Sequence, residues 1–229
     1  MIKLGIPSKG RLIADTIAWF ADQGITLRRS GSDREYAGEV TGIDGVELVL
    51  LSAGEIPREL AAGRIHLGVT GSDLIHEKLP LNATQTTEIA PLDFGHADLI
   101  IAVPNAWVDV ATLDDLDAAC AAFRATHGFR LRIATKFHRL VRDYLQANGV
   151  ADYQLVDSQG ATEGTVLNET AEAVADITST GVTLTANHLK MLSEEPIHKS
   201  QATLFASQTA AMTEAEKSTF DALVDMLGG

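Results

Sequence analysis

The sequence predicts an α/β fold made of two lobes. Short apolar segments with the length of a strand alternate with helix-length segments along the whole chain. Several strand-length segments run directly into a loop rich in glycine and hydroxyl side chains. Alternation of this kind favours largely parallel sheets covered by helices. A chain of 229 residues can form one large domain or two small ones.

Each expected element has a local reason. Glycine closes the helices expected before Gly24, Gly63 and Gly149. Thr213 and Glu216 form a capping box that starts the last helix. The expected strands cover residues 3–6, 46–50, 65–70, 99–103, 131–135, 153–156, 173–178 and 202–205. The expected helices cover residues 12–23, 56–62, 72–77, 113–125, 138–148, 184–192 and a terminal stretch that ends near residue 226.

A lobe boundary is expected near residues 91–95, Pro-Leu-Asp-Phe-Gly, and a second sheet begins with the strand that follows. The helix expected over residues 184–192 is the natural place for the chain to return to the first lobe. The predicted first lobe is therefore discontinuous, with residues 1–92 and 185–229. The second lobe covers residues 93–184 and carries a phosphate loop. A ligand cleft between the lobes is expected, because small molecules commonly bind at domain interfaces and at the carboxyl ends of strands.

The composition, 45% hydrophobic and 21% charged, is that of an ordinary soluble protein. A formal net charge of −13 argues against nonspecific nucleic-acid binding, so cations that meet an anionic substrate must be concentrated locally. The single cysteine, Cys120, excludes an internal disulfide, and its apolar neighbours predict a packed thiol. The chain shows no signal peptide and no apolar run of membrane-spanning length. We expect a cytoplasmic protein without membrane association.

The most informative segment is Asp-Ile-Thr-Ser-Thr-Gly-Val-Thr-Leu at residues 176–184. An apolar strand runs into a Thr/Gly loop that opens a helix, and the free amides and hydroxyls there can surround a phosphate. Asp176 stands just before the loop, where a carboxylate could hold sugar hydroxyls, so the segment suits a sugar phosphate. A plain helix start with a hydroxyl cap is the alternative. The loop residues expected to contact the ligand are Ser179, Thr180, Gly181, Val182 and Thr183.

Other strand ends follow the same logic. Two cations, Lys9 and Arg11, flank a glycine at the start of a helix, which suits phosphate or pyrophosphate. A second Thr-Gly turn places Gly71 before Asp73, which either binds ligand or favours the positive helix start. Glu163 lies between glycines in a loop, either as a ligand-binding acid or as a surface charge.

Several kinds of site are not indicated. The seven histidines are scattered without the spacing of metal ligands, so no protein-held metal site is predicted. There is no Gly-Lys-Ser/Thr sequence, so the Walker signature is absent, and no nucleophile elbow suggests Ser/His/Asp chemistry. Lys136 stands at one further strand-to-helix turn, like the cations near the first strand.

Taken together, these residues resemble the ATP phosphoribosyltransferase family, which catalyses the first step of histidine biosynthesis. The matches occur in family order across most of the chain, which makes them more specific together than singly. Two places depart from the family pattern. Thr162, Gly164 and Thr165 surround Glu163 where the family often has Val, Ala and Pro, and Phe137-His138 replaces Tyr-Pro. The matching segments are residues 7–11, 55–57, 68–73, 132–136, 176–184 and 186–187.

The resemblance implies transfer of the phosphoribosyl group of phosphoribosyl pyrophosphate (PRPP) to N1 of ATP. The products are N1-(5-phosphoribosyl)-ATP and pyrophosphate, and Mg²⁺ is required, bound mainly by the substrates. The implied fold is like a type II periplasmic binding protein, with two lobes. The loop at residues 179–183 would bind the 5-phosphate of PRPP and Asp176 the ribose, while Lys9 and Arg11 would contact polyphosphate as further catalytic candidates. The residues implied for ATP are Lys9, Arg11, Gly71, Asp73 and Glu163.

The length resembles the short form of the family. That likeness implies a homodimer that assembles with a regulatory subunit, similar to histidyl-tRNA synthetase, into a hetero-octamer. Two other functions stay open. A cytoplasmic small-molecule-binding protein of the periplasmic-binding type would bind ligand without forming product. A phosphoribosyltransferase for a free purine base usually has two adjacent acids before its Thr-Gly loop, and Ala175 makes that function less favoured.

Overall fold

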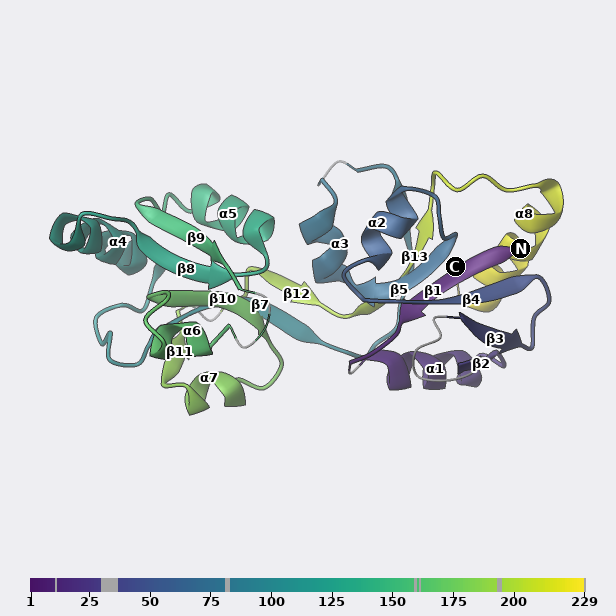
Figure 1. Cartoon of the computed structure of the whole chain (residues 1–229), viewed down its shortest axis with the longest axis horizontal. Helices are drawn as coiled ribbons and strands as arrows, with labels where there is room; N and C mark the ends of the chain where they lie inside the picture. Colours follow the sequence, from purple (N-terminus) through teal and green to yellow (C-terminus); the bar gives the residue numbers. More distant parts are fainter. Residues whose placement is uncertain are drawn as a thin grey trace. The chain divides into compact units, whose positions relative to one another are not determined.

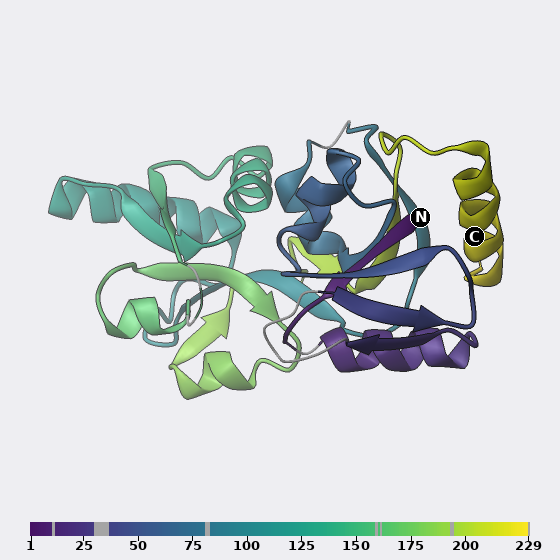
Figure 2. The same cartoon turned by 45° about the vertical axis from the view of Figure 1, so that its right-hand side comes forward.

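The computed structural model describes residues 1–10, 12–29, 37–80, 83–158, 160, 162–192 and 195–228. The chain divides into two compact units. Unit 1 contains Met1–His96 and Ser200–Gly229, and unit 2 contains Ala97–Lys199. Each unit has its own β-sheet with helices packed against it (Figure 1). The first strand and the last helix of the chain both belong to unit 1 (Figure 2).

The return of the chain to unit 1 differs from the sequence prediction. The predicted crossing lay at residue 185, whereas unit 2 continues to Lys199. The expected helix over residues 184–192 is in fact α7 (Val182–Ala186), followed by strand β11 (Leu189–Met191). β11 pairs antiparallel with β7 (Ala97–Pro104), the first strand of unit 2, and these backbone hydrogen bonds keep the segment in that unit.

Unit 1 contains a seven-stranded sheet in the order β2-β3-β4-β1-β5-β13-β6. Its helices are α1 (Leu12–Asp22), α2 (Ile56–Ala61), α3 (Ser72–Lys78) and α8 (Glu214–Met226). Its strands are β1 (Ile2–Pro7), β2 (Thr26–Arg29), β3 (Ala37–Thr41), β4 (Val46–Leu51), β5 (Leu67–Gly71), β6 (Thr86–Pro91) and β13 (Ala202–Ser207).

The sheet of unit 1 is mixed, so the expectation of largely parallel pairing is wrong here. β1 is parallel to β4 and β5, whereas β3 runs antiparallel to β2 and β4. β13 runs antiparallel to both β5 and β6. The reason is that β13 enters the sheet from unit 2 and not through the helical crossover that makes neighbouring strands parallel.

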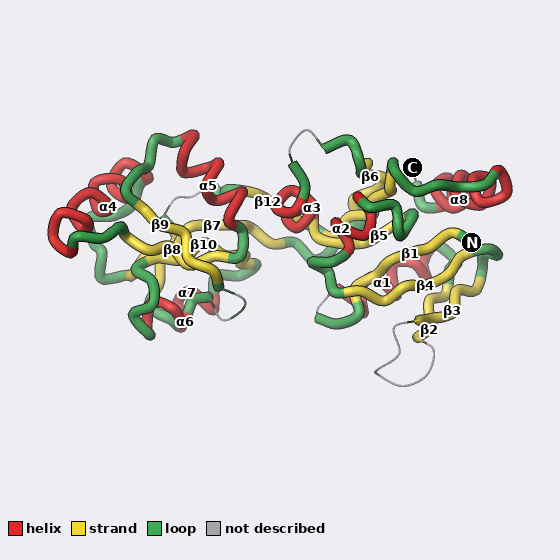
Figure 3. Tube along the Cα trace, turned by 45° about the horizontal axis from the view of Figure 1, so that its top comes forward, coloured by secondary structure: helices red, strands yellow, loops and turns green. Residues whose placement is uncertain are grey.

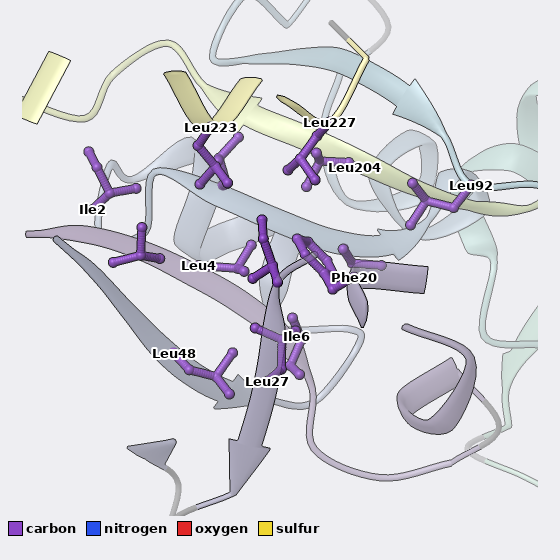
Figure 4. Close-up of a cluster of buried hydrophobic side chains, with 14 of the residues drawn as sticks. Ile2, Leu4, Ile6, Phe20, Leu27, Leu48, Leu92, Leu204, Leu223 and Leu227 are labelled. Carbon is purple, nitrogen blue, oxygen red and sulfur yellow. The ribbon is translucent and has the colours of Figure 1, made fainter. Parts of the chain in front are cut away.

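The core of unit 1 follows from the two-residue period of its strands. Ile2, Leu4 and Ile6 of β1 point to one face of the sheet, where they meet Phe20 of α1 and Leu223 of α8 (Figure 4). A second cluster on α2 and α3 contains Ile56, Leu60 and Ile75 and packs against partly buried side chains of β4. Alternate residues of β4 divide between the clusters: Val46, Leu48 and Leu50 join the first, and Val49 and Leu51 join the second.

Unit 2 contains a six-stranded sheet in the order β11-β7-β10-β8-β9, with β12 paired to β7. β8 is parallel to β9 and β10, and β7 is antiparallel to β10 and β11. Its remaining strands are β8 (Leu131–Thr135), β9 (Tyr153–Asp157), β10 (Ala173–Thr178) and β12 (His198–Ser200). Its helices are α4 (Leu113–His127), α5 (His138–Ala147), α6 (Gly164–Leu167) and α7.

Helices cover both faces of this second sheet. α4 and α5 lie on one face, and α6 and α7 lie on the other (Figures 1 and 3). Cys120 of α4 is fully buried, as expected for a packed thiol. Because β8, β9 and β10 are parallel, their carboxyl ends share one edge of the sheet, and the loop after β10 begins there. Within the described residues, no helix combines the length and apolar character required to cross a bilayer.

Candidate active site

A pocket of about 170 Å³ lies in unit 2 at the carboxyl end of β10. Asp176 occupies the end of that strand, and Glu163 immediately precedes α6. The pocket therefore combines two carboxylates with a loop rich in hydroxyl groups. Its lining residues are Glu163, Val174, Asp176, Ile177, Thr178, Ser179, Thr180, Thr183 and Leu184.

The loop after β10 turns sharply at Gly181. This glycine has a φ of +71°, in the left-handed region that L side chains rarely adopt, and it is the N-cap residue of α7. Its amide donates a hydrogen bond of 3.0 Å to Oγ1 of Thr178, which ties the two ends of the turn together. No amide of Ser179, Thr180, Val182 or Thr183 donates a hydrogen bond to another described residue. The turn thus offers several backbone donors to an anion at the pocket.

Asp176 makes its protein contacts through one carboxylate oxygen. Oδ1 accepts a hydrogen bond of 2.8 Å from the Ile177 amide, and Nζ of Lys136 lies 3.6 Å from the same atom. Lys136 follows β8, the parallel neighbour of β10, so the adjoining strand ends bring the two side chains together. The side chain of Asp176 is 20% exposed and lines the pocket, which leaves the carboxylate accessible to a ligand.

Glu163 lies in the same pocket as Asp176. The sequence interpretation grouped Glu163 with the ATP-binding residues, separately from the loop and Asp176. The local backbone explains its position. Ser158 after β9 and Thr162 are both buried, and the Ser158 hydroxyl donates a hydrogen bond of 3.2 Å to Thr162 Oγ1. This contact fixes the chain just before Glu163. Thr162, a departure from the family pattern, therefore has a structural partner.

The other predicted ligand residues belong to unit 1. Lys9 is exposed just beyond β1, and Arg11 lies outside the described residues. Ser8 is held by a hydrogen bond of 2.7 Å from its amide to the Leu51 carbonyl at the end of β4. The segment after β4 is ordered by Glu55, whose carboxylate accepts hydrogen bonds from the hydroxyl and amide of Ser52. The hydroxyl bond is the main reason that the pKa of Glu55 lies below its usual value.

Asp73 is buried at the start of α3 and is already engaged with the protein. The hydroxyl of Ser200 donates to Asp73 Oδ1 at 2.7 Å and accepts from the Asp73 amide at 3.1 Å. Gly71 leaves room for this carboxylate, because a Cβ built there would lie 2.1 Å from Asp73 Oδ1. The described geometry gives Asp73 a structural role at the helix start, which was one of the two interpretations of the sequence.

Sequence reasoning noted Lys136 at a strand-to-helix turn but did not connect it with Asp176. The signal available was the order of the strands: Lys136 directly follows β8, Asp176 lies near the carboxyl end of β10, and the two strands are parallel neighbours. Within the described part of the chain, no group of three or more His, Cys, Asp or Glu side chains could hold a metal ion.

Comparison with known proteins identifies the family. A family model described as "HisG: ATP phosphoribosyltransferase" matches residues 52–229. An ATP phosphoribosyltransferase from Cereibacter sphaeroides is 72% identical over 93% of this chain and 91% of its own length. The chain belongs to the ATP phosphoribosyltransferase family. Another member, from Rhodopseudomonas palustris strain BisA53, is 46% identical over 97% of this chain and 68% of its own length.

Solved structures show the same fold. The ATP phosphoribosyltransferase HisG:HisZ complex from Thermotoga maritima contains a chain that matches with a TM-score of 0.74 and 21% identity, covering 99% of this chain and 96% of that chain. The substrate-binding protein of an amino acid ABC transporter matches with a TM-score of 0.53 and 13% identity, covering 99% and 91%. The predicted α/β fold with lobes like those of periplasmic binding proteins is therefore confirmed for this ATP phosphoribosyltransferase family member.

Proposed function

We propose that this chain transfers the phosphoribosyl group of PRPP to N1 of ATP. The products are N1-(5-phosphoribosyl)-ATP and pyrophosphate, and the reaction is the first step of histidine biosynthesis. The observation that carries the proposal is the pocket that joins Asp176 and Glu163 to the hydroxyl-rich turn, in a chain of this family. Its lining suits a phosphorylated sugar: backbone amides and hydroxyls for the phosphate, and a carboxylate for the ribose.

The residues supply positioning and charge rather than a nucleophile. Adenine N1 forms a bond to C1 of the ribose while the bond from C1 to the pyrophosphate oxygen breaks. The nucleophile therefore comes from ATP and the leaving group from PRPP. Positive charge develops on the ribose ring as pyrophosphate leaves. A carboxylate at Asp176, fixed by the Ile177 amide at 2.8 Å, would hold the ribose hydroxyls and stabilise that charge. The turn at residues 178–183 would anchor the 5-phosphate.

The assignment of ATP contacts is part of the same proposal. Lys9 is exposed beyond β1 and is a suitable point charge for polyphosphate, and Arg11 is proposed beside it from the sequence alone. Gly71 and Asp73 are proposed near the nucleotide, with Asp73 acting while bonded to Ser200. Glu163 is proposed to orient ATP or the ribose, and its place in the same pocket as Asp176 favours the ribose.

Mg²⁺ is proposed as a substrate-bound cation. The pocket offers the oxygen donors that Mg²⁺ prefers, on Asp176 and Glu163, and the pyrophosphate of PRPP would supply further ones. When bound, the ion would neutralise charge on the departing pyrophosphate. Cytoplasmic location belongs to the proposal as well, because both substrates are intracellular metabolites.

A regulatory partner is also proposed. The Thermotoga maritima structure is a complex of two kinds of subunit, which supports assembly of this chain with a second kind of subunit. The family resemblance adds the proposal of a homodimer that joins a histidyl-tRNA-synthetase-like subunit in a hetero-octamer. Feedback inhibition by histidine would then reside on the partner. The expected result is a rise in turnover and a new sensitivity to histidine when that subunit is added to the purified chain. Full activity and histidine inhibition in the chain alone would contradict this part.

The proposed reaction is tested by the ATP- and PRPP-dependent rise in absorbance of phosphoribosyl-ATP, with Mg²⁺ and the regulatory subunit present. Asp176→Ala is expected to lower kcat/KM by about 30- to 1,000-fold, equivalent to roughly 2–4 kcal/mol of transition-state stabilisation. Asp143→Ala is the matched control, because Asp143 is an exposed carboxylate on α5 that does not line the pocket. Binding of both substrates without product would instead support a ligand-binding protein, and near-normal turnover of Asp176→Ala would reject the role of Asp176.

A further inference from the structure

We infer that Lys136 is a positioning residue that acts on the substrate through Asp176. This inference rests on the proposed function and assigns a role to a side chain that the proposal leaves unused. Nζ of Lys136 lies 3.6 Å from Oδ1 of Asp176, so the contact is an ion pair and is too long for a hydrogen bond. Both side chains are mostly shielded, with 33% and 20% exposed, so water weakens this pair less than a fully exposed one.

The two oxygens of the Asp176 carboxylate have different surroundings. Oδ1 faces Lys136 and also accepts the Ile177 amide bond of 2.8 Å. No hydrogen bond or ion pair among the described residues engages Oδ2. Contacts on a single oxygen fix the rotation of the whole carboxylate. Lys136 and the amide would thus hold Asp176 with Oδ2 presented to the ribose hydroxyls in the pocket.

Lys136 lies in a hydrogen-bonded turn. The Phe137 amide donates a hydrogen bond of 2.9 Å to Oγ1 of Thr135, and both of these side chains are fully buried. The Thr135 carbonyl accepts a further bond of 3.1 Å from the Ser158 amide at the end of β9. The ammonium group of Lys136 also lies 5.0 Å from the centre of the Phe137 ring, where the electron-rich face attracts a cation.

Strand register explains why the pair forms. β8 and β10 are parallel, and Val174 pairs with Ala134. Asp176 and Lys136 each stand two positions later on their chains, so they extend from the same face of neighbouring strand ends. The order of the strands thus places the Lys136 ammonium group next to the Asp176 carboxylate at the pocket. Among the described residues, Asp176 makes no other ion pair.

A double-mutant cycle tests the inference, with kcat/KM for PRPP as the measured quantity. Lys136→Met is expected to lower kcat/KM for PRPP about tenfold, which is within the usual range of coupling between residues of one ion-pair network. KM for ATP is expected to stay within about twofold of the wild-type value. Lys136→Arg keeps the charge and is expected to restore most of the loss. In an Asp176→Asn background, Lys136→Met is expected to change the constant by less than about twofold, because the partner it positions is already neutral.

The alternatives give different results. A tenfold loss in both backgrounds would show that Lys136 contacts substrate directly, and no loss in the wild-type background would show that it is not needed; either result overturns the inference. Arg124→Met is the control for removing one positive charge from unit 2, since Arg124 pairs with Asp152 and does not line the pocket. If Lys136→Met does not fold, as judged by circular dichroism, Lys136→Gln replaces it in the same cycle. Absence of phosphoribosyl-ATP formation by the unmodified protein would instead reject the proposed function.

Discussion

Replacing Gly181 by alanine separates the backbone role of this residue from its role in binding. Gly181 has a φ of +71°, and a Cβ added there would meet no heavy atom of the protein within 4 Å. The folding cost of Gly181→Ala therefore comes from the left-handed backbone alone. That cost is about 1–2 kcal/mol for an L side chain.

Gly149 is a matched control in the same unit. It follows α5 and has a φ of +73°, and a Cβ added at this glycine would likewise meet no heavy atom within 4 Å. Gly149 does not line the pocket. Gly149→Ala and Gly181→Ala are therefore expected to lower the free energy of unfolding by the same amount, measured by urea denaturation.

Binding of PRPP should distinguish the two variants. Relief of the strained φ in Gly181→Ala would rotate the amides of Val182 and Thr183 away from the phosphate. Loss of one charge-assisted hydrogen bond costs about 1.5–3 kcal/mol, so the Kd for PRPP is expected to rise about tenfold or more. Gly149→Ala is expected to keep the wild-type Kd within about twofold.

Isothermal titration with PRPP measures this difference, and KM for ATP serves as a check on the other substrate. Equal PRPP affinities for the two variants would refute the assignment of the turn as the phosphate site. A large loss of affinity in Gly149→Ala would show that general destabilisation of unit 2 explains the effect. Gly181→Val is expected to weaken PRPP binding more than Gly181→Ala does, because a branched side chain adds bulk beside the ligand.

Three further expectations concern unit 1 and the buried thiol. Gly71→Ala should lower the free energy of unfolding by more than about 1 kcal/mol and weaken ATP binding, because the new Cβ would lie 2.1 Å from Asp73 Oδ1; unchanged thermal unfolding would contradict this. Burial lowers the pKa of His66 from 6.5, so the unfolded chain binds the proton first. The contribution of neutral His66 to the free energy of unfolding should be fully present above pH 6.5 and should be lost as the pH falls through the folded-state pKa. Urea denaturation at several pH values measures this loss, which should be smaller in His66→Asn. Burial raises the pKa of the Cys120 thiol to about 12, so iodoacetamide at pH 8 should label it only after unfolding, and rapid labelling of the native chain would disprove its shielding.

The sequence predicted the elements whose signals are local. The apolar run of β10 and the Thr/Gly turn after it are contiguous, and Thr213 with Glu216 forms the expected capping box. Hydroxyl and carboxylate groups at a helix start act over a few residues, so they can be identified without knowing the fold. The same locality explains why the pocket residues on the turn were found together.

Contacts between segments that are far apart in the sequence could not be predicted from such local signals. Strands β2, β3 and β6 are short or partly exposed, and their place depends on neighbours that the sequence does not reveal. The apolar spacing after Leu184 resembled a longer helix, but His188 has a φ of +57° and the next residues pair with β7. The Asp73–Ser200 bond joins the two sequence segments of unit 1, which unit 2 separates, and the Lys136–Asp176 pair depends on strand order.

The position of β13 governs the order in which the units can fold during synthesis. This strand lies between β5 and β6, yet the whole of unit 2 is translated before it. The edges of β5 and β6 that face β13 must therefore wait without their partner while the ribosome makes residues 97–199. Unit 2 is contiguous in sequence and can complete its sheet as soon as it has been synthesised. Unit 2 can therefore fold before unit 1, whose sheet is completed only when β13, its last strand, leaves the ribosome.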